Sequence, residues 1–403
     1  MICMEKINTN RIAIEQATER SIATILPSRE ALINELMSGK KMKFYIGCDA
    51  TGPDLHIGHA TNFLLLERLR KLGHEIIVLF GDFTARIGDP TGRDTERKML
   101  SEAEVGENIS NWTHQVGRAL NLNDAHNPVR IEKNSSWLGK LGFAEVLDLA
   151  SSFTAQQMIE RDMFEKRWKN KKPIYLHEFL YPLMQGYDSV ALGVDGEVGG
   201  NDQTFNMLTG RTLLKKYKNT EKFVIATTLL INPKTGKKLM SKSEGRYVAL
   251  SATPHDMFGG VMALPDEAIS QLFIDCTEVP ITEVGQWEQK LKDGVNPRDV
   301  KIHLATEIVT RFHSRTDAEK ARASFRATFG EGRPQEFVDV PQASAVETLL
   351  ENGIITSKTD LRRLIAEGAV TEVGSGKKQG EDFLKNPPPG EYRLGKHRFV
   401  RIV

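Results

Sequence analysis

A predicted strand that passes through a tight turn directly into a helix is the feature that most constrains the fold of this chain. Residues 43–48 are apolar enough for a strand, a turn rich in Gly and Pro follows, and residues 57–72 have a helical pattern closed by Gly73. Further strands are predicted at 75–80, 129–132 and 223–230. Strands that alternate with helices predict an α/β fold with a parallel, doubly wound, Rossmann-like sheet. Ligands of such sheets bind beyond the carboxyl ends of the strands, at a switch point.

Two histidines lie one helical turn apart at the first strand-to-helix junction. His56 and His59 flank Ile57-Gly58, and the free backbone N–H groups and the dipole of a helix start favour a phosphate there. Paired histidines also occur as ordinary surface residues or as metal ligands. The short string alone leaves these alternatives open.

A polar loop rich in Lys and Gly follows the predicted strand at 223–230. It contains Met240-Ser241-Lys242-Ser243. A solvated basic loop is the simple interpretation of such a run. If this loop folds against the two histidines, its cations are suited to neutralising a phosphate group.

Composition sets limits on the class of protein. With 403 residues, 40% hydrophobic and 27% charged, the chain is predicted to form two or three domains. The net charge is only +1, so any surface for nucleic acid must be a local patch. No apolar run approaches a membrane span and the N-terminus lacks a signal-peptide core, which predicts a cytoplasmic protein without membrane contact. The three cysteines have no metal-type spacing, and no metal site is expected.

The apolar pattern divides the chain into units. Residues 1–42 are predicted to form an N-terminal helical arm, because Ile and Leu recur there at roughly helical spacing. A Rossmann-like domain, a mostly helical domain, a Gly- and Pro-rich linker and a small basic α/β domain follow at 43–250, 251–335, 336–344 and 345–403. The clearest helix start is at Asn296-Pro297, where Asn caps and Pro suits the first helical position.

Together, the two motifs are similar to those of the class I aminoacyl-tRNA synthetases, over about residues 43 to 250. The resemblance implies that His56 and His59 donate hydrogen bonds to the triphosphate of ATP as its α-phosphorus becomes five-coordinate. It also implies that Gly58 lets the adenine ring approach the backbone. Donors aimed at charge that develops in the transition state act on rate and not on ground-state binding.

In this family a lysine-bearing loop closes over the phosphates, and the resemblance assigns that role to Lys242. The chain departs from the family at Leu239, which stands where the first lysine of the motif is expected, with Lys238 just before it. Arg93 and Arg97 are further candidates for the phosphate side of the site. Solvated loop arginines are the alternative for both.

Within the class, the chain resembles the tyrosyl-tRNA synthetases. Tyr181, Gln185 and Asp188 have i, i+4, i+7 spacing and share one face of a predicted helix. The resemblance implies that Tyr181 and Gln185 bind the α-amino end of tyrosine, and that Asp188 and Tyr45 hold its phenolic hydroxyl. An ordinary amphipathic helix with a solvated or capped Asp188 is the alternative. Pro182 leaves open whether the helix begins there or runs through it.

The resemblance assigns two more residues to the amino-acid pocket. Asp89 is expected to help bind the ammonium group, and Gln203 to orient the carboxylate. Selection in such a pocket is asymmetric, because phenylalanine leaves unpaired a buried carboxylate that expects an O–H donor. The wrong substrate is then rejected by a desolvation penalty and not by shape.

Four further residues are assigned to the nucleotide by the same resemblance. Gly200 and Asp202 lie where two glycines precede a likely helix cap, so that a ribose or adenine can press against bare backbone. A plain loop-to-helix cap is the alternative. Asp49 and Thr51 match positions that line the nucleotide site in the family.

The carboxy-terminal unit resembles an S4-type RNA-binding domain. Lys358, Arg362 and Arg363 have i, i+4, i+5 spacing on a short predicted helix, which suits phosphate contacts. A basic surface helix without function is the alternative. The family is dimeric, with one tRNA contacting both subunits, so a homodimer and tRNA(Tyr) are the partners that the resemblance implies.

The resemblance therefore predicts a tyrosine–tRNA ligase. The carboxylate of L-tyrosine attacks the α-phosphorus of ATP, which enters as its Mg²⁺ complex, and the resulting adenylate passes its acyl group to the end of the tRNA. Positioning and charge stabilisation suffice for both steps, and no covalent nucleophile is needed. A tryptophan–tRNA ligase and a non-catalytic RNA-binding paralogue are the alternatives.

Overall fold

A computed structural model describes residues 7–90, 100–160, 162–241, 247–330, 337–352, 354–355, 357–395 and 398–403. A six-stranded sheet has the order β1-β6-β5-β2-β3-β4, and all of its strands except β1 are parallel. The parallel strands are β2 (Lys43–Cys48), β3 (Glu75–Phe80), β4 (Arg130–Lys133), β5 (Gly196–Gly200) and β6 (Phe223–Thr227). Numbered among themselves, they follow the Rossmann order 3-2-1-4-5, with the switch point between β2 and β5. The prediction of an α/β, mostly parallel sheet is confirmed.

Two strand predictions need correction. The strand predicted at 223–230 ends at Thr227. β5 was not predicted at all, because its sequence Gly-Glu-Val-Gly-Gly lacks the β-branched residues that mark a strand. Its backbone is nevertheless held between β2 and β6, so pairing on both sides replaces the missing local propensity.

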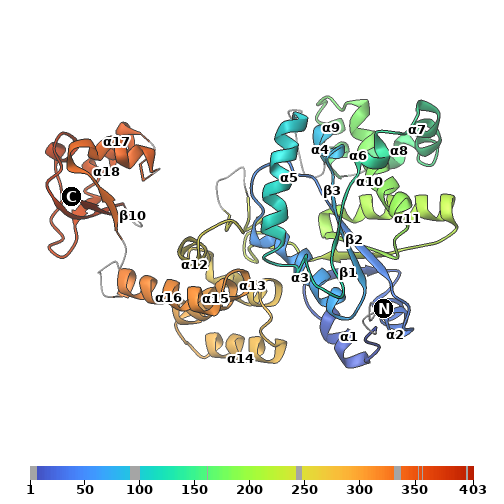
Figure 1. Cartoon of the computed structure of the whole chain (residues 1–403), viewed down its shortest axis with the longest axis horizontal. Coiled ribbons are helices and arrows are strands. Elements are labelled where there is room, and N and C mark those ends of the chain that lie inside the picture. The colour runs from blue at the N-terminus through green and yellow to red at the C-terminus, as the bar shows by residue number, and fades with distance from the viewer. Residues whose placement is uncertain are drawn as a thin grey trace.

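Helices cover both faces of the sheet (Figure 1). Alternate residues of β2 point to opposite faces: Phe44 packs in the same core as α3 (Ile57–Lys71), whereas Tyr45 packs with residues of α10 (Leu176–Leu192) and α11 (Thr204–Lys218). The period of the strand therefore directs Tyr45 toward the helix that carries Asp188.

Further helices fill the connections between these elements. They are α4 (Thr84–Ile87), α5 (Glu102–Val116), α6 (Ser135–Leu138), α7 (Phe143–Ala150), α8 (Ala155–Ile159), α9 (Asp162–Lys169) and the 3-10 turn η1 (Asn201–Gln203).

The N-terminal segment is not purely helical. α1 (Arg11–Thr18) and α2 (Arg29–Met37) flank a strand, β1 (Ile22–Leu26), which pairs antiparallel with β6 at the sheet edge. The helical prediction for residues 1–42 is therefore wrong for Ile22–Leu26. The pairing with β6, a partner about two hundred positions away, decides the conformation there.

A helical unit follows the sheet domain, as predicted. It contains α12 (Pro254–Met262), η2 (Asp266–Ala268), α13 (Ile269–Cys276), α14 (Ile281–Lys292), α15 (Pro297–Phe312) and α16 (Arg315–Gly330). The predicted start of α15 is confirmed, because the Asn296 side chain accepts a hydrogen bond from the Arg298 N–H and Pro297 is the first helical residue.

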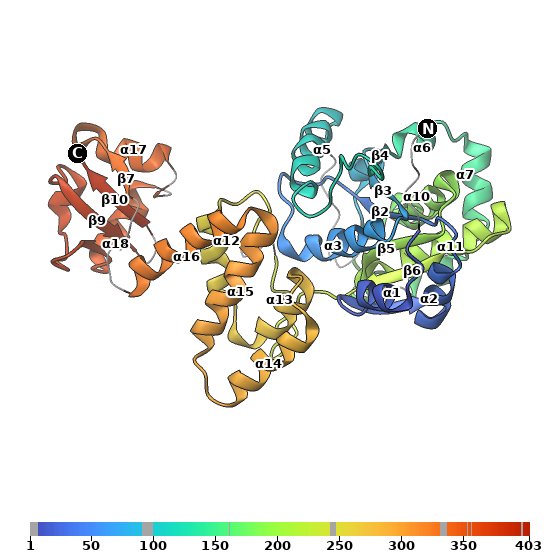
Figure 2. The same ribbon diagram turned by 60° about the horizontal axis from the view of Figure 1, so that its bottom comes forward.

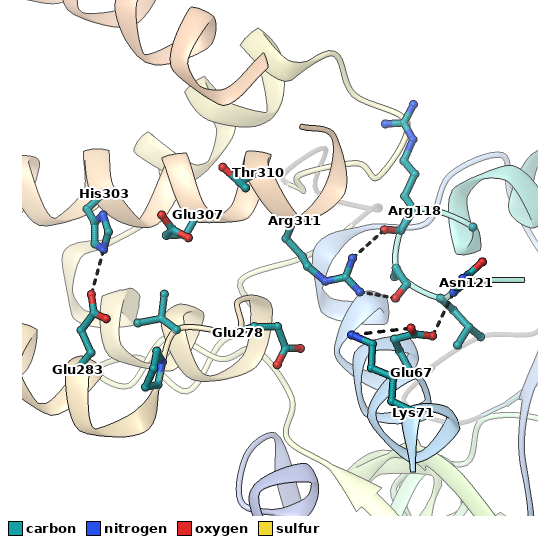
Figure 3. Close-up of a pocket in the computed structure, with 15 residues that line it drawn as sticks. Glu67, Lys71, Arg118, Asn121, Glu278, Glu283, His303, Glu307, Thr310 and Arg311 are labelled. Atoms are coloured by element: carbon teal, nitrogen blue, oxygen red, sulfur yellow. Dashed lines mark hydrogen bonds and ion pairs between the residues drawn. The ribbon is translucent and has the colours of Figure 1, made fainter. Parts of the chain in front are cut away.

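A polar cavity of about 700 Å³ lies where the helical unit meets the sheet domain (Figure 3). Arg311 of α15 crosses this junction and donates hydrogen bonds to the backbone oxygens of Arg118 and Ala119, at 3.2 and 2.6 Å. Farther toward the start of α15, His303 Nε2 lies 3.6 Å from Glu283 of α14. Arg311, which bonds to two backbone carbonyls of the sheet domain, thus fastens the two units to each other.

The C-terminal unit has a separate core at the far end of the molecule (Figures 1 and 2). Its four-stranded sheet has the order β7-β10-β9-β8. The elements are β7 (Val338–Val340), η3 (Gln342–Ser344), α17 (Ala345–Glu351), α18 (Lys358–Ala366), β8 (Val370–Glu372), η4 (Glu381–Leu384), β9 (Gly390–Leu394) and β10 (Arg398–Ile402). The linker prediction for 336–344 is wrong for Val338–Val340, because β7 pairs with β10 and closes the sheet of this unit.

Burial of His74 leads to a prediction about acid stability. Its side chain is fully buried between α3 and β3, Nδ1 accepts a hydrogen bond from the Met42 N–H at 3.4 Å, and burial lowers its pKa from 6.5 to about 4. The unfolded chain takes up a proton at His74 below pH 6.5, whereas the folded chain does so only near pH 4. Stability is therefore lost as the pH falls through this window, by about 2 kcal/mol between pH 7 and 5.

We expect His74→Gln, which binds no proton, to remove that part of the pH dependence. Urea unfolding of wild type and variant at pH 7 and pH 5 measures the difference. His114→Gln, which removes an exposed histidine, is the matched control and should keep the wild-type slope. Parallel losses of stability in wild type and His74→Gln would contradict the assignment.

Candidate active site

The first motif forms the turn from β2 into α3. His56 is the N-cap of α3, and its backbone N–H donates to His59 Nδ1 at 3.1 Å. The two rings stack with their centroids 3.7 Å apart. Because Nδ1 of His59 accepts this hydrogen bond, the proton of the neutral ring is on Nε2. The turn thus sets His59 as a donor through Nε2 at the start of the helix.

Met240 of the second motif and the segment 247–250 that follows it pack directly on this turn. The Ile57 N–H donates to the Val248 oxygen at 3.0 Å, and the Leu250 N–H donates to the Leu55 oxygen at 2.8 Å. A Cβ built on Gly58 would lie 3.5 Å from Met240 Cγ and 3.1 Å from His56 Nδ1. The structure therefore brings together two stretches far apart in sequence, and Gly58 lies where they touch.

Three predicted phosphate contacts fall on residues that are not described. Arg93, Arg97 and Lys242 lie outside the described ranges. Just before Lys242, Leu239 is buried, and its N–H donates to the Leu230 oxygen at 2.9 Å. The preceding Lys238 is exposed, and its Nζ lies 3.0 Å from Asp202 Oδ2. Leu239, which stands in place of the family's first lysine, is thus part of the core. Lys238 is held beside Asp202, a residue that was predicted to bind the nucleotide.

The segment after β5 lies across the switch point from the histidine turn, since β5 pairs with β2. Asp202 lies in η1, and Gly200 precedes it. A Cβ on Gly200 would approach Asp202 Oδ1 to 2.8 Å, closer than real Cβ atoms come. The carboxyl ends of β2 and β5 therefore face the same edge of the sheet, where a doubly wound fold binds its ligand.

The predicted face of α10 points into the protein. α10 runs without a break from Leu176 to Leu192 with Pro182 inside it, so the helix does not begin at the proline. The Tyr181 hydroxyl donates to Asp49 Oδ2 at 2.8 Å, and Asp188 is only 3% exposed. The alternative of a solvated Asp188 is excluded by this burial.

Asp188 is held by two donors that sequence reasoning missed. Trp137 Nε1 donates to Asp188 Oδ1 at 2.8 Å, and Asn134 Nδ2 donates to Oδ2 at 3.3 Å. Burial raises the pKa of Asp188 well above its usual value, and these two hydrogen bonds oppose that rise. Asn134 also donates to Thr84 Oγ1, which in turn donates to Asp49, at 3.0 and 2.7 Å. The carboxylate is thus linked to the loop that follows β2.

A second network joins the other pocket residues. Gln203 Nε2 donates to Asp89 Oδ2 at 2.6 Å. Asn206 Nδ2 donates to the side-chain oxygens of Gln203 and Gln185, at 3.0 and 2.9 Å. Gln185 Nε2 donates to Glu197 Oε1 at 3.1 Å. Asn206 is fully buried and connects the two glutamines that were predicted to bind the substrate.

Tyr45 is also fully buried, with its hydroxyl 2.7 Å from Ser189 Oγ. Burial raises its pKa, and the carboxylates of Glu197 and Asp188 raise it further. Tyr45 and Asp188 thus lie in one buried region. The only signal for Ser189 in the sequence is that it follows Asp188, and nothing in the sequence marked Glu197 as its neighbour.

The remaining predicted residues lie elsewhere. Lys358, Arg362 and Arg363 are exposed on α18 in the C-terminal unit. Among the described residues, no three or more His, Cys, Asp and Glu side chains are grouped to hold a metal ion. No helix in the described ranges combines the length and apolar character needed to cross a membrane.

Comparison with known proteins places the chain in one family. Residues 37–330 match the family of class I tRNA synthetases for W and Y. Curated relatives named tyrosine–tRNA ligase include the protein of Carboxydothermus hydrogenoformans, 40% identical with 96% of each chain covered. The Thermotoga maritima protein is 39% identical, with 95% of this chain and 96% of that one covered.

Solved structures share the fold. A C-terminally truncated mitochondrial tyrosyl-tRNA synthetase of Aspergillus nidulans matches with a TM-score of 0.67 at 23% identity, over 79% of this chain and 94% of that one. Tyrosyl-tRNA synthetase of Archaeoglobus fulgidus complexed with L-tyrosine matches with a TM-score of 0.60 at 22% identity, over 77% of this chain and 99% of that one. The chain therefore belongs to the class I tRNA synthetase family for tryptophan and tyrosine.

Proposed function

We propose that the chain is a tyrosine–tRNA ligase, which activates L-tyrosine with ATP and transfers it to the 3′ end of tRNA(Tyr). The observation that carries this proposal is the buried Asp188, held by Trp137 and Asn134 next to Tyr45 and connected to the loop at Asp49. The near full-length relatives named tyrosine–tRNA ligase support the same conclusion.

The phenol end of tyrosine is recognised by Asp188 and Tyr45 in this proposal. Asp188 already accepts a hydrogen bond at each oxygen and has lone pairs left for one more donor. The phenolic O–H of tyrosine supplies that donor. Indole has no phenolic hydroxyl, which argues against the tryptophan alternative.

The amino-acid end is recognised by Tyr181, Gln185, Asp89 and Gln203. Because the Tyr181 proton is donated to Asp49, the lone pairs of its oxygen can accept from the substrate ammonium group. Asp89 adds a negative charge, and Gln203, which donates to Asp89, orients the carboxylate. The carboxylate of the bound tyrosine then lies toward the N-terminus of α3, which binds the α-phosphate of ATP.

ATP, as its Mg²⁺ complex, occupies the edge between β2 and β5. The N-terminus of α3 and the donors of His56 and His59 face the phosphates. Gly58 and Gly200 leave room for adenosine, and its remaining contacts come from Asp49, Thr51 and Asp202. Lys242 and Arg97 neutralise the departing pyrophosphate. These groups lower the barrier by positioning and charge stabilisation alone.

A homodimer is the assembly that we propose. Large apolar side chains are exposed along the segment from α7 to the start of α10: Phe143 79%, Leu147 55%, Trp168 64%, Tyr175 45% and Leu176 82%. Soluble monomers seldom expose so much apolar surface in one region. A second copy of the chain would cover it.

The C-terminal unit is proposed to contact tRNA through α18. Lys358 pairs with Glu347, and Arg363 pairs with Asp360 and Glu367. Arg362 is exposed, and no ion pair involves it among the described residues. Arg362 is therefore the least compensated cation of the three and the best placed for a phosphate.

We expect Arg362→Glu to raise the KM for tRNA(Tyr) about tenfold, since it removes a phosphate contact and adds a repulsive charge. Aminoacylation at several salt concentrations measures this effect. Pyrophosphate exchange, which needs no tRNA, should be unchanged. Lys385→Glu, on an exposed residue after η4, is the matched charge reversal, and an equal effect there would contradict a specific role for Arg362.

ATP–pyrophosphate exchange across amino acids tests the proposed activity. Exchange that depends on tyrosine supports the ligase. Exchange with tryptophan alone would establish the tryptophan alternative, and no exchange with any amino acid would establish the non-catalytic paralogue.

A further inference from the structure

A fully buried lysine lies beneath the proposed tyrosine pocket. Lys222, the residue before β6, has 0% side-chain exposure and forms an ion pair with Glu197, which is also buried. Its Nζ donates to Ser189 Oγ at 2.6 Å and lies 5.5 Å from the centre of the Tyr45 ring. A buried ammonium is costly unless it is paired and hydrogen-bonded. The ion pair with Glu197 compensates the buried charge, and the hydrogen bond to Ser189 is an additional contact.

Proton counting gives the hydrogen bonds a direction. An ammonium group donates only, so Ser189 must accept from Lys222. The single proton of Ser189 can then go to the Tyr45 hydroxyl at 2.7 Å or to Glu197 Oε2 at 3.5 Å. Hydroxyl hydrogen bonds are 2.5 to 3.0 Å long. Either hydroxyl can be the donor in the 2.7 Å contact. Because the 3.5 Å contact with Glu197 is too long for a hydroxyl hydrogen bond, we assign the proton of Ser189 to Tyr45, which leaves the proton of Tyr45 for another acceptor.

We propose that Lys222 is a positioning residue for tyrosine selection: acting through Ser189, it makes the Tyr45 hydroxyl a hydrogen-bond donor to the phenolic oxygen of bound tyrosine. This inference rests on the proposed function of the pocket. The substrate's own O–H then donates to Asp188, so that the phenol donates on one side and accepts on the other. Such a pocket requires a ligand group that both donates and accepts a hydrogen bond, and phenylalanine has no such group.

Ser189→Ala cuts this relay while leaving the ion pair of Lys222 and Glu197 in place. We expect kcat/KM for tyrosine in pyrophosphate exchange to fall about five- to tenfold, the effect of one hydrogen bond. The change should appear in KM, because the phenol lies far from the reacting carboxylate. The value of kcat/KM for phenylalanine should not change. Ser324→Ala, a buried serine in α16, is the matched control.

A double variant tests Lys222 itself without leaving a buried charge unpaired. Lys222→Met combined with Glu197→Gln contains neither charge of the ion pair and is compared with the wild-type protein. The double variant should have a tyrosine-over-phenylalanine ratio about fivefold below that of the wild type. Thermal unfolding of each variant verifies that it is folded.

Equal losses for tyrosine and phenylalanine would overturn the proposal, because Ser189 and Lys222 would then act only on the fold. An unchanged ratio in Ser189→Ala and in the double variant would overturn it as well. Suppose that the wild-type protein exchanges with tyrosine and that Asp188→Asn lowers the tyrosine-over-phenylalanine ratio. Either of these outcomes then refutes only the relay through Lys222 and Ser189. If wild type shows no dependence on tyrosine, the proposed function itself has failed.

Discussion

Asp188→Asn is expected to lower kcat/KM for tyrosine by about 10- to 100-fold and to leave that for phenylalanine nearly unchanged. The substitution removes a charged hydrogen-bond acceptor for the phenol. The new amide group also fits the site poorly, because Trp137 and Asn134 each donate to one oxygen of Asp188. An Asn side chain has only one acceptor atom, so its N–H₂ group must face a donor or the substrate hydroxyl.

Pyrophosphate exchange with tyrosine and with phenylalanine measures this effect as a ratio. The expected loss follows the general rule for sites that hydrogen-bond a substrate hydroxyl, for which tyrosyl-tRNA synthetases against phenylalanine are the standard case. Asp275→Asn is the matched control, since Asp275 is buried in α13 and burial raises its pKa too. An undiminished preference for tyrosine in Asp188→Asn would refute the role of this carboxylate.

His59→Asn is expected to slow adenylate formation by about 10²- to 10³-fold, with little change in tyrosine affinity. In the structure, His59 Nδ1 accepts the His56 N–H, which leaves Nε2 as the donor of the ring. An Asn side chain can accept the same backbone hydrogen bond through its oxygen, and therefore preserves the helix start. It does not reach as far as Nε2, so the donor to the transition state is lost.

Stopped-flow measurement of adenylate formation separates the two effects. The rate constant at saturating substrates should fall, and the dissociation constant of tyrosine should stay close to the wild-type value. His59→Gln is the complementary variant, because its amide reaches the Nε2 position, and it should recover part of the rate. A variant with weak tyrosine binding and a normal rate constant would contradict a transition-state role.

Features set by short stretches of chain were predictable from the sequence. The helix after β2, its start between two histidines, the cap at Asn296 and the shared face of Tyr181, Gln185 and Asp188 all depend on residues within a few turns of one another. Backbone geometry and helical period determine such features locally. The α/β class followed from the alternation of these local elements.

Strands with weak local signals were not predictable. β1 and β7 lie in stretches that were predicted to be helical and linker, respectively, and β5 lies where no strand was predicted. Each one is held by backbone pairing to a strand elsewhere in the chain, β6, β2 or β10. Such pairing can override local propensity, because hydrogen bonds along the two paired strands and burial of the strand outweigh the conformational preference of single residues.

The sequence by itself determined the class of sheet, the two motifs and the types of side chain that line the site. Only the tertiary structure decided which groups surround them: Trp137 on Asp188, Asn206 between the two glutamines, and Lys222 under Ser189 and Tyr45. Most of these partners come from other elements of the chain, and burial forces each polar atom to find whichever donor or acceptor the packing brings near. The spacing of residues in the sequence does not predict these partners, because they come together only when the helices pack on the sheet.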